Sequence, residues 1–160
     1  KGGTVFELKT GGPGHQIRTP SGFPGRQCGA VPTEAGMVLA WLAGGGGGLR
    51  FSTIVPAKTP ETEILLPKKS IGMLNLVGDA GTAWASFSVE GETARDSTGA
   101  WAVCLPDGKP FPVVDDDRDV SEVHLIPTGS GPLCSVVLLD VTDELFALKD
   151  GQAKSKGLLG

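Results

Sequence analysis

Short apolar segments separated by glycine, proline and small polar residues recur along the chain, and this pattern constrains the fold more than any other feature. The 160 residues include 25 Gly and 12 Pro, which interrupt helices and mark turns. Segments of this length between such residues are typical of strands. The pattern predicts strands at residues 4–9, 36–43, 49–55, 63–66, 72–77, 83–90, 100–105, 110–114, 122–127 and 133–141.

These segments predict an all-β fold, an antiparallel β-sandwich or a jelly-roll-like barrel with long Gly/Pro-rich loops. We expect one loop at residues 11–32, and an exposed hairpin tip at the five glycines of residues 44–48, whether that run is natural or engineered. Residues 1–149 are predicted to form a single β-sandwich domain. Residues 150–160 are predicted to form a polar C-terminal tail or linker.

Two strands give specific predictions about burial. Residues 82–90 alternate, which predicts a half-buried strand with Trp84 on its polar, exposed side and with Ala83, Ala85, Phe87 and Val89 in the core. Residues 134–141 are more uniformly apolar, which predicts a central strand with both faces covered. Residues 140–149 fit either a short helix or a bent strand. Trp41 and Trp101, embedded in apolar segments, are predicted to be core residues.

Charge and cysteine spacing exclude several classes of protein. The net charge is −4, and no clustered basic face is visible, so we expect no nucleic-acid binding by this domain. No apolar segment approaches the 20 or so residues that span a bilayer, so we expect no membrane insertion. The three cysteines, Cys28, Cys104 and Cys134, lack the close doublets of zinc or redox sites and are predicted to be buried free thiols.

Residues 128–133, Thr-Gly-Ser-Gly-Pro-Leu, resemble the sequence around the nucleophile of chymotrypsin-like serine proteases. The resemblance implies Ser130 as nucleophile and His15 as base, with glycine amides forming an oxyanion hole. His124 lies only six residues before Ser130 on the same predicted strand, which holds the two side chains apart. The carboxylates considered for the third role are Asp79, Asp96 and Asp107. The alternative is an ordinary β-turn, which leaves no catalytic residue.

Three alternate carboxylates, Asp115, Asp117 and Asp119, are predicted to bind a metal, Ca²⁺, which prefers several oxygen ligands. The alternative is an acidic turn that keeps a loop solvated and opposes edge pairing. Trp84 is the candidate binding residue, for a sugar ring or for a neighbouring subunit. A carbohydrate-binding module is therefore a further hypothesis.

The segment from Gly131 to Phe146, Gly-Pro-Leu-Cys-Ser-Val-Val-Leu-Leu-Asp-Val-Thr-Asp-Glu-Leu-Phe, resembles the final strand of coat-protein β-sandwiches in small icosahedral RNA viruses. The resemblance implies a shell or projecting domain of a capsid, located in the virion. Its partners would be identical subunits, with a host receptor or glycan as a further partner. The basic arm usual in such chains is absent, which fits a projecting domain better than a whole coat protein. The hypothesis is thus a structural and interaction domain rather than an enzyme.

Overall fold

The computed structural model describes residues 5–7, 15–17, 27–42, 48–55, 62–65, 70–90, 99–106, 108–114, 118–140 and 142–159. All regular structure in these ranges is β-strand, and the paired strands are antiparallel. The predicted all-β antiparallel fold is confirmed. None of the described residues belongs to a helix long and apolar enough to cross a membrane.

Twelve of the strands form three sheets of four, each built from consecutive strands in sequential order. The first contains β3 (Cys28–Thr33), β4 (Gly36–Leu42), β5 (Leu49–Val55) and β6 (Thr62–Ile64); the middle sheet contains β7 (Ser70–Asp79), β8 (Thr82–Glu90), β9 (Gly99–Leu105) and β10 (Phe111–Val114); the last contains β11 (Val120–Ile126), β12 (Leu133–Leu138), β13 (Asp143–Lys149) and β14 (Gln152–Leu158). A separate pair joins β1 (Val5–Glu7) to β2 (His15–Ile17).

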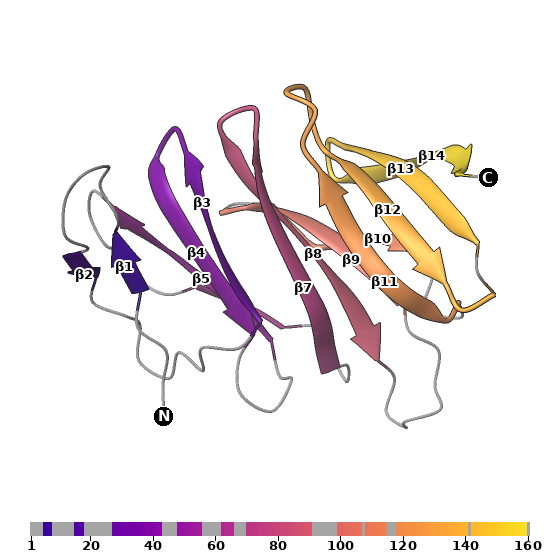
Figure 1. Ribbon diagram of the computed structural model, residues 1–160, viewed down its shortest axis with the longest axis horizontal. Coiled ribbons are helices and arrows are strands. Elements are labelled where there is room, and N and C mark those ends of the chain that lie inside the picture. Colours follow the sequence, from indigo (N-terminus) through magenta and orange to yellow (C-terminus); the bar gives the residue numbers. More distant parts are fainter. Residues whose placement is uncertain are drawn as a thin grey trace.

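The three sheets stand side by side, with the first strand of each next to the first strand of its neighbour (Figure 1). Such repeated four-stranded sheets are the building units of β-propellers. The close approach of β7 to β3 requires glycine, because a Cβ on Gly78 would lie 2.8 Å from the Pro32 carbonyl oxygen. At the β11 edge, the Leu125 amide donates to Asn75 Oδ1 of β7 over 3.1 Å.

Two hydrophobic cores fill the spaces between the sheets. One joins the first sheet to the middle sheet and includes Val38, Phe51 and Phe87. The other joins the middle sheet to the last and includes Trp84 and Val136. Both faces of the middle sheet are therefore buried, because a sheet packs on each of them.

The structure corrects two predictions about the loops and termini. Within the predicted loop at residues 11–32 lie β2 and most of β3. Proline has no N–H group to donate to a neighbouring strand. Because β3 is an edge strand with a partner on one side only, it accommodates Pro32. The predicted tail at residues 150–160 contains β14, which pairs with β13 along its length. Main-chain hydrogen bonding, rather than side-chain hydrophobicity, holds this polar strand in the sheet.

Other predictions are settled strand by strand. The choice between helix and strand at residues 140–149 resolves to strand β13. The β4–β5 hairpin is confirmed by the pairing of Leu42 with Leu49; residues 43–47 lie outside the described residues, and Gly48 is buried. Trp41 is fully buried, as predicted, whereas Trp101 is only half-buried. The cysteines are free, as predicted, but Cys28 is exposed and Cys104 half-buried.

Candidate functional site: the hairpin tips and the open sheet face

The Ser130 segment is the loop between β11 and β12, and its conformation is held by Asp79 of the middle sheet. The Asp79 carboxylate, 5% exposed, accepts hydrogen bonds from the Gly129 amide at 2.5 Å and the Gly131 amide at 2.8 Å. Thr128 Oγ1 donates to the Gly131 carbonyl over 2.8 Å. Both glycines have positive φ, 85° and 116°, which suits residues without a Cβ. The loop is thus a clamped turn.

This geometry gives the protease hypothesis no support. The two glycine amides that would form an oxyanion hole already bind a carboxylate of the same chain. His124 lies exposed on β11, where its Nε2 is 2.8 Å from the Glu122 carboxylate. His15 pairs with Glu7 through the β1–β2 backbone, and its side chain lies outside the described residues, as do Asp96 and Asp107.

The β7–β8 turn also contacts the first sheet. The Glu34 amide, in the β3–β4 turn, donates to the Gly81 carbonyl over 2.8 Å. Together with Asp79, this contact links three successive hairpin tips along one edge of the molecule (Figure 1). The tips therefore fix how each sheet stands against the next.

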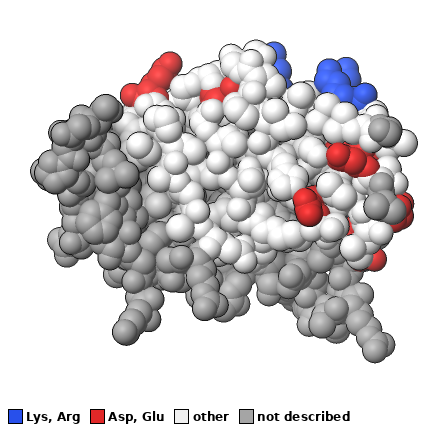
Figure 2. Space-filling model, viewed as in Figure 1, with Lys and Arg blue, Asp and Glu red and all other residues white. Residues whose placement is uncertain are grey.

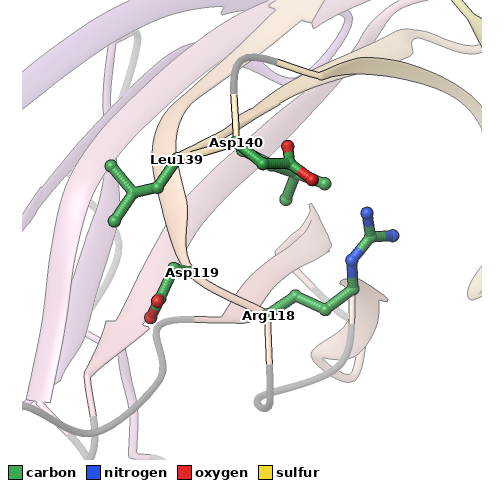
Figure 3. A pocket seen from close by; sticks show the side chains of 5 residues that line it. Arg118, Asp119, Leu139 and Asp140 are labelled. Atoms are coloured by element: carbon green, nitrogen blue, oxygen red, sulfur yellow. The ribbon is translucent and has the colours of Figure 1, made fainter.

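The predicted calcium ligands are only partly described. Asp115 and Asp117 lie outside the described residues, while Asp119 is exposed just before β11. Within the described ranges, no three His, Cys, Asp or Glu side chains gather as a metal site. Figure 3 shows the Asp119 carboxylate pointing away from Asp140 and from the Arg118 guanidinium. The calcium site stays a prediction.

Asp119 and Asp140 border a shallow hollow of about 270 Å³ at the β12–β13 turn (Figure 3). The side chain and amide of Thr142 hydrogen-bond Asp140, and with the nearby Arg118 charge they lower the pKa of that carboxyl. Arg118 itself pairs with Glu144 at 2.8 Å. Arg118 and Asp140 therefore already have partners, and nothing in the hollow resembles a catalytic set.

Trp84, the predicted binding residue, is buried and only 8% exposed. Its indole nitrogen donates to Thr82 Oγ1 over 3.0 Å, and its ring belongs to the core between the middle and last sheets. The prediction that it is exposed is wrong, because the last sheet covers the polar side of β8. Trp84 has no accessible ring face with which to stack on a sugar.

A further apolar surface lies on the last sheet, on the face turned away from the middle sheet; we name it the open face. Val136 and Leu138 point into the core, so Val137 between them points outward. By the same alternation Leu145 and Ala147 of β13 point outward, on either side of the buried Phe146. The apolar residues of the open face are Ile126, Leu133, Val137, Leu145 and Ala147, of which Ile126 is 43% exposed and the others are half-buried.

The charges of the open face are divided between its two ends. Glu122 and Asp143 both pair with Val137 across the sheet, so they lie in one row near the β12–β13 turn. Lys149 and Lys154 lie at the opposite end, near the β13–β14 turn. In Figure 2, over the last sheet, basic side chains are at the top and acidic side chains lie lower.

Sequence reasoning missed the open face. The alternation of Glu122, His124 and Ile126 with buried valine and leucine was one signal of an outward-facing row. The uniform apolarity of β12 concealed the other, since it predicted cover on both faces. No family model, curated protein or solved structure matches this chain.

Proposed function

We propose that this chain is a structural and interaction domain that works by associating with another protein through its open face. The observation that carries the proposal is the row of apolar side chains on a sheet that no described element covers. Contiguous apolar surface of this kind marks interaction sites in folded proteins. Sheets hide such faces by packing on other sheets about 10 Å away.

The described residues support this function better than the alternatives. The amides beside Ser130 are occupied by Asp79, and the Trp84 ring is buried. Neither a protease nor a carbohydrate-binding module is therefore favoured by a specific contact. Subunit assembly in a viral capsid, or attachment to a receptor, is one setting for such a domain and stays a prediction from the sequence.

Light scattering over a range of protein concentrations, with Leu145→Lys as the variant, tests the proposal. We expect the parent chain to form assemblies larger than a monomer, and Leu145→Lys to be monomeric and to melt where the parent melts at concentrations at which it is dissociated. Leu65→Lys, the same change at a leucine that is 62% exposed just after β6 of the first sheet, is the matched control and should assemble like the parent. A parent chain that stays monomeric, or assemblies that Leu145→Lys leaves intact, would contradict the proposal.

A further inference from the structure

We draw no further inference here: the strongest candidate, the open face of the last sheet with its apolar side chains on β11, β12 and β13, is the surface already described, and nothing in the structure shows what covers it.

Discussion

The middle and last sheets have the same strand order but differ in what covers them. The middle sheet is buried on both faces, and even its polar row is enclosed: Ser86 and Ser88 of β8 are fully buried. Only one face of the last sheet packs on another sheet among the described residues, although Val137 and Leu145 on its other face are apolar. Position in the stack, rather than the hydrophobicity of a face, decides which side chains are removed from water.

The largest expected effect comes from two adjacent residues of β12. Val136 is fully buried between the sheets, whereas Val137 lies on the open face. Val136→Lys buries an unpaired charge and should lower the free energy of unfolding by at least about 4 kcal/mol. Val137→Lys should change it by less than about 1 kcal/mol. Urea titration at a concentration where the chain is monomeric measures both, and equal losses would show that the open face is covered.

The next largest loss of stability is expected at the hydrogen bonds between Asp79 of the middle sheet and the Ser130 loop of the last sheet. Asp79→Ala removes the acceptor for the Gly129 and Gly131 amides and should lower the free energy of unfolding by about 3 kcal/mol. Asp79→Asn keeps one acceptor oxygen and should lose about half as much. Hydrogen exchange of the two glycine amides should accelerate in both variants. Unchanged exchange rates would argue against the clamp.

The covered face of the last sheet has a thiol whose titration reports its burial. Burial raises the pKa of the Cys134 thiol from 9.0 to about 12. The unfolded chain therefore loses this proton at lower pH than the folded one, and above pH 9 folding retains a proton that unfolding releases. The contribution of Cys134 to stability is complete below pH 9 and declines by about 1.4 kcal/mol per pH unit toward pH 12.

This decline is measured as the difference between the parent chain and Cys134→Ala. Urea midpoints from pH 8 to 10.5 should converge as the pH rises, because the variant lacks the titrating thiol. Parallel curves would mean that water reaches the covered face.

The smallest expected changes in stability come from two buried serines, one in the middle sheet and one in the last sheet. The hydroxyl of Ser86, in the middle sheet, is buried with no hydrogen-bond partner among the described residues. Ser135, in the last sheet, donates to Asp143 Oδ1 over 2.7 Å. Ser86→Ala should raise the free energy of unfolding by about 1 kcal/mol, and Ser135→Ala should lower it by a similar amount. Calorimetry distinguishes the two signs, and a destabilised Ser86→Ala would point to a water or carbonyl partner.

The sequence by itself determined that the chain is built of antiparallel strands, because turn-forming residues and alternating side chains are local signals. It also located nine of the twelve strands of the three sheets, β4 to β12, and placed Phe87 in the core, whereas β3 fell in a predicted loop and β13 was left open between helix and strand. Strands without an apolar signal were missed, as β14 shows, because main-chain pairing with β13 does not depend on hydrophobic side chains.

Only the tertiary structure decided which faces are covered. Trp84 lies on the polar side of an alternating strand and Val137 on a uniformly apolar one, yet stacking buries Trp84 and leaves Val137 half-exposed. Stacking of the sheets also brings Asp79 to the Ser130 loop, some 50 residues further along the chain. A glycine amide of the candidate oxyanion hole therefore binds the Asp79 carboxylate. Such contacts depend on the order in which whole sheets stack, and a local pattern of residues carries no record of that order.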